Sequence, residues 1–168
     1  MKTDEVAKAR LVEEPLRAAF EEHYADVLRF CRLVSGRRDV AEDLAQEAFV
    51  RLASRIDRLE PGAIGPYVRR IAVNVWKNRL RRLALERRHP AERPGPAPGA
   101  PSMEERDELM TALRRLPVRQ RACLVLRYYE DLSEKDTAAT LGCSVGTVKS
   151  STSRALARLR KELADADR

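Results

Sequence analysis

A stripe of basic and hydroxyl side chains near the C-terminal end of the chain has the chemistry of a DNA contact. Its members lie one, three and four residues apart, so that they share one face of a helix: Lys149, Ser150, Ser153 and Arg154. Basic groups bind phosphates, while hydroxyl and guanidinium groups hydrogen-bond to the edges of bases. The segment 145–161 holds five basic residues and no acidic one. We therefore predict that this stripe binds nucleic acid.

The sequence around the stripe predicts a helix-turn-helix at about 133–161. Residues 133–141 indicate a short helix with Ser133 as its N-cap. Gly142-Cys143-Ser144 indicates a tight turn, and residues 145–164 indicate a long helix. This motif places its second helix in the major groove of DNA. Helical hairpins that bind no DNA share the pattern, so both interpretations stay open on this segment alone.

A second basic face lies in residues 66–82, PYVRRIAVNVWKNRLRR, which contain six basic residues and no acidic one. Asn74 and Asn78 lie four residues apart on one face, with Arg81 three residues further on. Asparagine reads base edges, and an aromatic side chain such as Trp76 can stack on unpaired bases. The alternative is a solvated basic face with Trp76 in the core, which is the commoner arrangement for such a stripe taken alone.

The segment 39–47 has the opposite character, because four acidic residues lie close together there: Asp39, Glu42, Asp43 and Glu47. Asp43, Gln46 and Glu47 share a face at i, i+3 and i+4. An acidic patch repels DNA, so in a DNA-binding protein it indicates a second, basic partner. Favourable interaction with a helix N-terminus is the alternative, and it accounts poorly for Glu47, which lies two turns in.

Helices are expected to position these side chains. Apolar residues recur with a period close to 3.6 over residues 15–34, and Gly36 is expected to end that helix. Asp39 is expected to cap a second helix that runs to about Leu59. Residues 61–66, PGAIGP, indicate a short loop, and a third helix is expected to start with Pro66 in its first turn.

A proline-rich segment, HPAERPGPAPGAP at 89–101, separates the chain into two halves. It contains five of the nine prolines and lacks apolar residues for a core, so we expect an extended linker. The halves, 14–88 and 102–165, each have a size that suits a compact unit of three or four helices.

The second half is also expected to be helical. Ser102 ahead of Glu105 predicts the start of a helix that ends at Leu116, and Pro117 begins another that reaches about Tyr129. Hydrophobic residues nowhere alternate with period two for long enough to make a strand. The predicted fold is all-α, with two small helical domains joined by a Pro-rich linker, the second containing the helix-turn-helix.

Composition and charge restrict the classes of function that the protein could have. The net charge of +7 and the pI of about 9.7 suit an anionic partner, with nucleic acid ahead of a membrane surface. No apolar run approaches the roughly 18–20 residues of a membrane span. The charged N-terminal segment lacks the apolar stretch of a secretory signal. We therefore expect a cytoplasmic protein with no membrane contact of its own.

Catalytic and metal-binding groupings are not evident in the sequence. Cys31, Cys123 and Cys143 are far apart and lack CxxC spacing, so neither a disulfide framework nor a zinc site is expected. His23 and His89 have no partner at ligand or triad spacing. We therefore expect no catalytic residue, no metal and no cofactor.

At these motifs the chain resembles an extracytoplasmic-function (ECF) sigma factor of bacterial RNA polymerase. The stretch 39–47, DVAEDLAQE, is similar to the polymerase-binding helix of that family. The stretch 70–82, which starts with RIAVN, resembles the helix that opens and reads the promoter −10 element. Four stretches resemble the domain that reads the −35 element: 116–121, 126–133, 146–150 and 154–160. The order of these motifs, with a linker between them, makes the resemblance specific.

The resemblance implies a role in promoter-specific initiation, with residues 14–88 as the region-two domain and residues 102–165 as the region-four domain. It implies that Asp43, Gln46 and Glu47 meet the clamp helices of the largest polymerase subunit, with the second-largest subunit as a further contact. It assigns −10 DNA to Asn74, Lys77, Asn78 and Arg81, and −35 DNA to Thr147, Lys149, Ser150, Ser153 and Arg154.

The resemblance also makes residues 57–65 the loop that would hold a flipped −10 base. The chain departs from the family pattern at Thr137, where Ile or Val is usual, and at Ser153, where some members carry a larger side chain. An anti-sigma factor commonly holds this family inactive and is a further candidate partner, although no residue indicates one here.

Three other classes of protein fit less well. A free-standing helix-turn-helix regulator leaves the acidic segment and the asparagine-bearing helix without roles. A purely helical adaptor leaves two basic faces unexplained. An enzyme is least favoured, because no nucleophile–base or metal grouping can be assembled.

Overall fold

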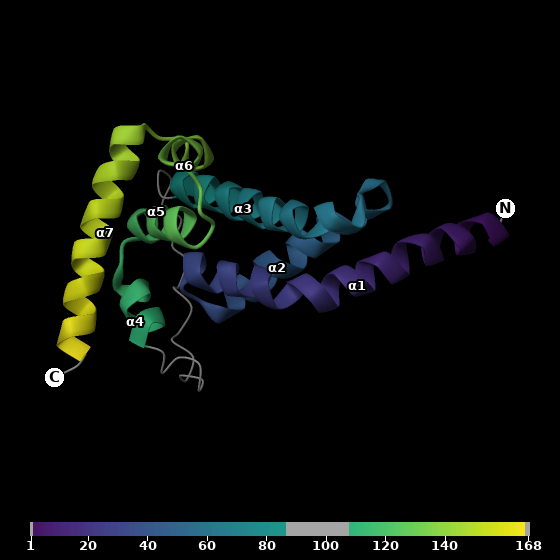
Figure 1. Cartoon of the computed structure of the whole chain (residues 1–168), viewed down its shortest axis with the longest axis horizontal. Helices are drawn as coiled ribbons and strands as arrows, with labels where there is room; N and C mark the ends of the chain where they lie inside the picture. Colours follow the sequence, from purple (N-terminus) through teal and green to yellow (C-terminus); the bar gives the residue numbers. More distant parts are fainter. Residues whose placement is uncertain (1, 87–107, 167–168) are drawn as a thin grey trace. The chain divides into compact units, whose positions relative to one another are not determined.

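The regular structure of the described residues is entirely helical. The computed structural model describes residues 2–86 and 108–166 (Figure 1). Within these ranges no strand occurs, and the all-α prediction is confirmed. Contacts between residues divide the chain into two compact units, one of Met1–Arg32 with Arg38–Trp76 and the other of Leu33–Arg37 with Lys77–Arg168.

The first unit is built from three long helices and a short 3-10 helix: α1 (Lys2–Ser35), α2 (Arg38–Ala53), η1 (Ile56–Arg58) and α3 (Pro61–Glu86), of which the ends of α1 and α3 group with the second unit. Val27 and Phe30 lie three residues apart on α1 and are at most 2% exposed. Leu44 of α2 and Val68 of α3 are equally buried. Full burial of each such side chain stabilises the fold by about 1.5–3 kcal/mol.

Two helices of the first unit have limits other than those expected. Helix α1 begins at Lys2 and therefore contains Pro15 in its interior rather than at its start. Charged residues with good helix propensity flank this proline and continue the helix on both sides. Helix α2 begins one residue before Asp39, so this carboxylate lies in the first turn and not at the N-cap. It still interacts favourably with the helix dipole there.

Helix α2 also ends at Ala53, before the expected limit near Leu59. The backbone tightens at this point, because the Arg55 N–H donates to the Leu52 carbonyl three residues back at 2.9 Å. The 3-10 helix η1 follows and buries Ile56.

The expected loop at 61–66 is wrong, because Pro61 is the first residue of α3. A proline fits this first position well, since the N–H that it lacks has no intrahelical partner there. Pro66 lies inside the helix, where it has no N–H to donate to the Gly62 carbonyl. Burial of Val68, Ala72 and other apolar side chains along α3 outweighs this lost hydrogen bond.

The second unit contains α4 (Glu108–Arg115), α5 (Val118–Tyr128), α6 (Glu134–Leu141) and α7 (Val145–Ala166). The last helix contacts each of the other three along its length (Figure 1). Near its middle, this helix packs Ala155 into a cluster with Leu113, Leu116 and Leu124. The predicted helices of the helix-turn-helix and the helix that follows Pro117 are confirmed.

Part of the predicted organisation falls on residues that are not described. The linker at 89–101 and the capping pair Ser102 and Glu105 lie outside the described ranges. The first described helix of the second unit therefore begins at Glu108.

Candidate nucleic-acid interface

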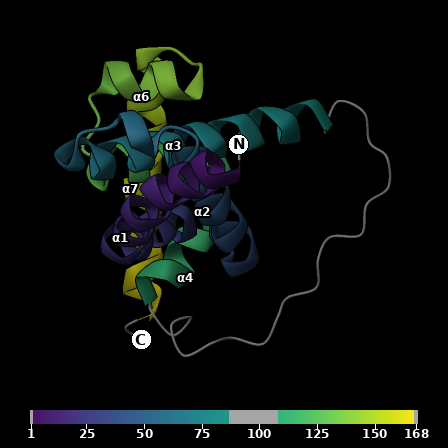
Figure 2. The ribbon, with the colours of Figure 1, turned by 90° about the vertical axis from the view of Figure 1, so that its right-hand side faces the viewer.

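Local hydrogen bonds cap the first turn of each helix in the helix-turn-helix. Helix α6 begins at the predicted cap, where the Ser133 hydroxyl accepts a hydrogen bond from the Asp136 N–H at 3.0 Å. It ends at Gly142, whose φ of 64° is left-handed. Helix α7 begins after Ser144, whose hydroxyl accepts from the Thr147 N–H at 3.1 Å. These residues therefore mark the limits of the turn between α6 and α7, which meet near the top of Figure 2.

The predicted stripe on α7 is divided between exposed and engaged side chains. Lys149, Ser153 and Arg154 are exposed, whereas Val148 and Ala155 on the opposite side are fully buried. The remaining two predicted contacts, Thr147 and Ser150, are half-buried. The Ser150 hydroxyl donates to the Thr147 carbonyl at 3.1 Å, and the Thr147 hydroxyl lies 2.9 Å from that of Ser144.

The two exposed cations of this stripe have different surroundings. The Lys149 ammonium lies 3.6 Å from a carboxylate oxygen of Glu134, the first residue of α6. In the described part of the chain, Arg154 has no ion pair. Sequence reasoning missed Glu134, because only the angle between α6 and α7 brings it to Lys149.

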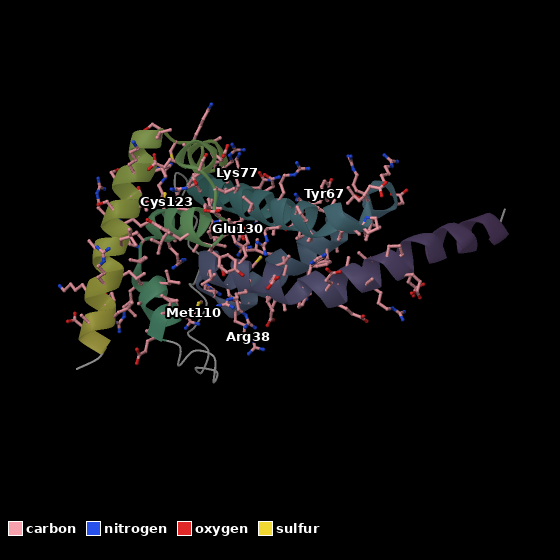
Figure 3. All side chains as sticks on the ribbon, in the orientation of Figure 1. Arg38, Tyr67, Lys77, Met110, Cys123 and Glu130 are labelled. Carbon is pink, nitrogen blue, oxygen red and sulfur yellow. The ribbon has the colours of Figure 1, made fainter. Side chains whose placement is uncertain are left out.

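Two small residues of the second unit are buried. Thr137 of α6 is fully buried, and its hydroxyl has no hydrogen-bond partner among the described residues. Cys123 of α5, labelled in Figure 3, is also buried, and burial raises the pKa of its thiol. An unfavourable environment for a thiolate makes this cysteine a packing residue rather than a reactive one.

The asparagines on the basic face of α3 are exposed to solvent. Asn74, Asn78 and Arg81 are exposed, and Lys77, labelled in Figure 3, is half-buried. Trp76 is 3% exposed, so it belongs to the core and offers no ring for stacking on a base. The predicted polar residues of α3 therefore lie on one accessible side of the helix, whereas Trp76 is not accessible to DNA.

A cleft of about 400 Å³ lies between α1 and the start of α3 in the first unit. Its polar lining consists of His23, Asp26 and Arg69, and the Asp26 and Arg69 side chains approach to 3.9 Å. The floor is tight, because a Cβ added to Gly65 would lie 2.8 Å from the His23 ring. No sequence signal marked this cleft, since its two walls come from segments about 40 residues apart.

The acidic stripe of α2 is exposed as predicted. Asp43, Gln46 and Glu47 face solvent, while Leu44 and Ala45 between them are buried. Glu47 pairs with Arg51 at 2.6 Å and Glu42 pairs with Arg38 at 2.9 Å, so helix-internal arginines partly neutralise the stripe. The start of this helix is marked by Arg38 in Figure 3.

Val50 extends the acidic stripe of α2, because it lies three residues after Glu47 and is 72% exposed. Sequence reasoning did not single out this apolar end of the stripe. Protein interfaces have an apolar core within a polar rim, and this face combines both kinds of group.

The chain combines a helix-turn-helix that has a basic outer stripe with a second basic helix that displays asparagines, and this combination defines a helical DNA-binding protein of the transcription-factor class. Two family models match the chain, Sigma-70 region 2 at residues 19–86 and Sigma-70, region 4 at residues 106–159. The chain belongs to the ECF sigma factors, which bind core RNA polymerase and promoter DNA and direct transcription initiation.

Known relatives match most of the chain. The RNA polymerase sigma-E factor of Streptomyces coelicolor is 37% identical over 155 residues, which cover 87% of each chain. The ECF RNA polymerase sigma factor SigM of Mycobacterium tuberculosis is 35% identical over 146 residues, covering 86% of this chain and 74% of the relative. These names describe transcription factors rather than enzymes.

A solved structure is also similar. The sigma factor RpoE in a co-crystal with the anti-sigma factor NepR from Bartonella quintana superposes with a TM-score of 0.58 at 27% identity. The match covers 90% of this chain and 98% of that one. Among the described helices, none combines the length and the apolar character needed to cross a membrane.

Proposed function

We propose that the chain gives core RNA polymerase its promoter specificity through three helices that each bind a different partner. Helix α2 binds the polymerase, α3 reads and holds the −10 element, and α7 reads the −35 element. The observation that carries this proposal is the exposed acidic stripe of Asp43, Gln46 and Glu47 in a chain that also has two basic faces. A protein that bound DNA unaided would have no use for such a stripe.

The α2 stripe is assigned to the clamp helices of the largest polymerase subunit, with the second-largest subunit as a further contact. The charge of the stripe supports a basic partner, and Val50 supplies apolar area next to it. The proposed domain limits are residues 14–88 and 102–165, with the linker at 89–101.

Helix α3 is assigned to single-stranded −10 DNA through Asn74, Lys77, Asn78 and Arg81. Residues 61–65, part of the loop expected to hold a flipped base, are helical. The cleft between α1 and α3 is the better candidate. Its Asp26 carboxylate would accept a hydrogen bond from the exocyclic amino group of cytosine or adenine.

Helix α7 is assigned to duplex −35 DNA in the major groove through Thr147, Lys149, Ser150, Ser153 and Arg154. Because Thr147 and Ser150 hydrogen-bond within the helix terminus, we assign them to positioning and to phosphates. The exposed Ser153 and Arg154 are assigned to base edges.

Strand opening in this scheme is driven by binding energy, so the chain itself needs no catalytic residue, metal or cofactor. It would act in the cytoplasm, where the polymerase transcribes. The RpoE relative was crystallised with an anti-sigma factor, which supports a regulator of the same class for this chain.

The test is a gel shift with duplex promoter DNA selected from genomic fragments by the reconstituted holoenzyme. We expect a specific shift with chain and core polymerase together, and none with either component alone at the same concentration. A specific shift by the chain alone, unchanged when core is added, would instead identify a free-standing regulator.

A further inference from the structure

The pairing between Glu134 and Lys149 has a consequence for the strength of DNA binding. We propose that Glu134 is a positioning residue that holds the Lys149 ammonium and thereby weakens its contact with DNA phosphates. The chain on its own would then bind duplex DNA of any sequence more weakly. This inference rests on the proposed role of α7 in −35 binding.

The geometry favours a fixed carboxylate and a mobile ammonium. Glu134 follows the Ser133 cap directly, and Thr137 and Ala138 of the same short helix are buried. Its backbone therefore has little freedom. Lys149 carries its charge on a flexible four-carbon stem, and its side chain is 63% exposed against 39% for Glu134. The ammonium is thus the group that can leave the pair, and a phosphate is the group that can attract it.

Electrostatics give the pair its effect on binding. A phosphate that attracts Lys149 must compete with Glu134, and it then lies close to a negative charge that α6 holds in place. Removing the Glu134 charge should strengthen DNA binding. Because exposed ion pairs are weak, the gain in affinity should be only about threefold to fivefold. The factor should be the same for −35 duplex and for unrelated duplex, because a phosphate contact carries no sequence information.

Other acidic groups at this end of α6 are placed differently. Asp136 accepts a hydrogen bond from the Ser133 hydroxyl at 2.5 Å and belongs to the cap. Asp131 is exposed, lies three residues before Glu134, and has a left-handed φ of 51°. The structure gives it no ion pair with a cation of α7. Asp131→Asn is therefore a matched control, since it removes one negative charge and asparagine tolerates this backbone conformation.

The experiment measures binding of the full chain to −35 duplex and to unrelated duplex by fluorescence anisotropy at several salt concentrations. We expect Glu134→Gln to bind both about threefold to fivefold more tightly and to steepen the salt dependence by a fraction of one ion. Asp131→Asn should change affinity clearly less. A structural defect predicts the opposite sign, because loss of the Glu134 charge weakens the N-terminus of α6.

A double-mutant cycle separates the two ways in which Glu134 could act. In a Lys149→Ala background, Glu134→Gln should leave affinity unchanged if the glutamate acts through Lys149. An equal gain in both backgrounds would mean direct repulsion of DNA and would overturn the positioning role. If wild type and all variants fail to bind duplex DNA even within the holoenzyme, the proposed function of α7 fails instead.

Discussion

The Ser144 hydroxyl lies at the start of α7 and accepts a hydrogen bond from the Thr147 backbone N–H at 3.1 Å. The two side-chain hydroxyl oxygens lie 2.9 Å apart, and the Val148 N–H bonds to the Ser144 carbonyl at 3.1 Å. Ser144 therefore satisfies the first turn of the helix that we assign to −35 DNA. The position of Thr147 on that turn, and of Lys149 just after it, depends on this cap.

Ser144→Ala should loosen the first turn of α7. Loss of an N-cap hydroxyl costs about 1 kcal/mol, so the amides of residues 147–148 should exchange their hydrogens about fivefold faster. Hydrogen exchange followed by mass spectrometry or NMR measures this. Ser153→Ala, at an exposed position further along α7, should leave exchange at the first turn unaltered. Equal protection in wild type and Ser144→Ala would show that the hydroxyl does not cap the helix.

The double substitution Gln46→Ala with Glu47→Lys should abolish binding to core polymerase, because it reverses the charge of Glu47 and leaves the α2 stripe with no net charge. It should leave the fold intact, since both side chains are exposed and only the Glu47–Arg51 pair is lost. Affinity for core is measured by biolayer interferometry and folding by circular dichroism. Glu13→Lys is the matched control, because it breaks a similar pair with Arg17 on α1. Wild-type affinity in the double mutant would remove α2 from the interface.

Asn74→Ala or Asn78→Ala should slow formation of the open complex on duplex promoters. Extruding a base from the stack costs a few kcal/mol, and the exposed asparagine amides are placed to compensate for part of that cost. Abortive initiation assays should show partial recovery on templates with a pre-melted −10 region. Equal defects on duplex and pre-melted templates would place these asparagines outside the melting step.

Arg154→Ala and Lys149→Ala should weaken −35 binding in different ways. Arginine can pair with guanine through two hydrogen bonds, so Arg154→Ala should cost about 1–3 kcal/mol and relax preference at one position. Lys149→Ala should weaken all sequences evenly and flatten the salt dependence by at most about one ion, because Glu134 already holds part of that charge. Titration of −35 variants at several salt concentrations distinguishes them. A uniform loss in both would assign base reading to Ser153 or DNA shape.

Thr137→Val should stabilise the second unit. The side chain is fully buried, and its hydroxyl has no hydrogen-bond partner among the described residues. Replacing that hydroxyl by a methyl group of similar size removes a desolvation cost of about 1–2 kcal/mol. Urea unfolding followed by circular dichroism should show a higher midpoint. An unchanged or lower midpoint would mean that the Thr137 hydroxyl is hydrogen-bonded in solution.

Sequence reasoning predicted the helix-turn-helix best, because its limits are set by local chemistry. Ser133 and Gly142 each act within four residues of their own position, so their effect is visible in the sequence. It failed at the start of α3, where Pro61 and Pro66 indicate a loop by themselves. Tertiary burial of the following apolar residues decided the structure there, and burial depends on other helices.

In the candidate site, too, features set by neighbouring residues could be predicted, whereas features set by tertiary packing could not. The exposed faces of α2, α3 and α7 follow from helical periodicity, and Asp43, Asn74 and Arg154 are accessible as predicted. The pairing of Lys149 with Glu134 depends on how two helices pack, and the burial of Trp76 depends on a whole core. Neither relationship has a signature in the spacing of residues.

The left-handed backbone at Gly142 restricts which residues can replace this glycine in related sequences. A Cβ added there would meet no atom within 4 Å, so handedness alone, and not lack of room, selects glycine. Asparagine is the one common substitute with a tolerable energy in that conformation. Gly146, four residues later, has helical backbone and a nearest neighbour 3.8 Å from its added Cβ. Substitutions are therefore tolerated at position 146 and almost excluded at position 142.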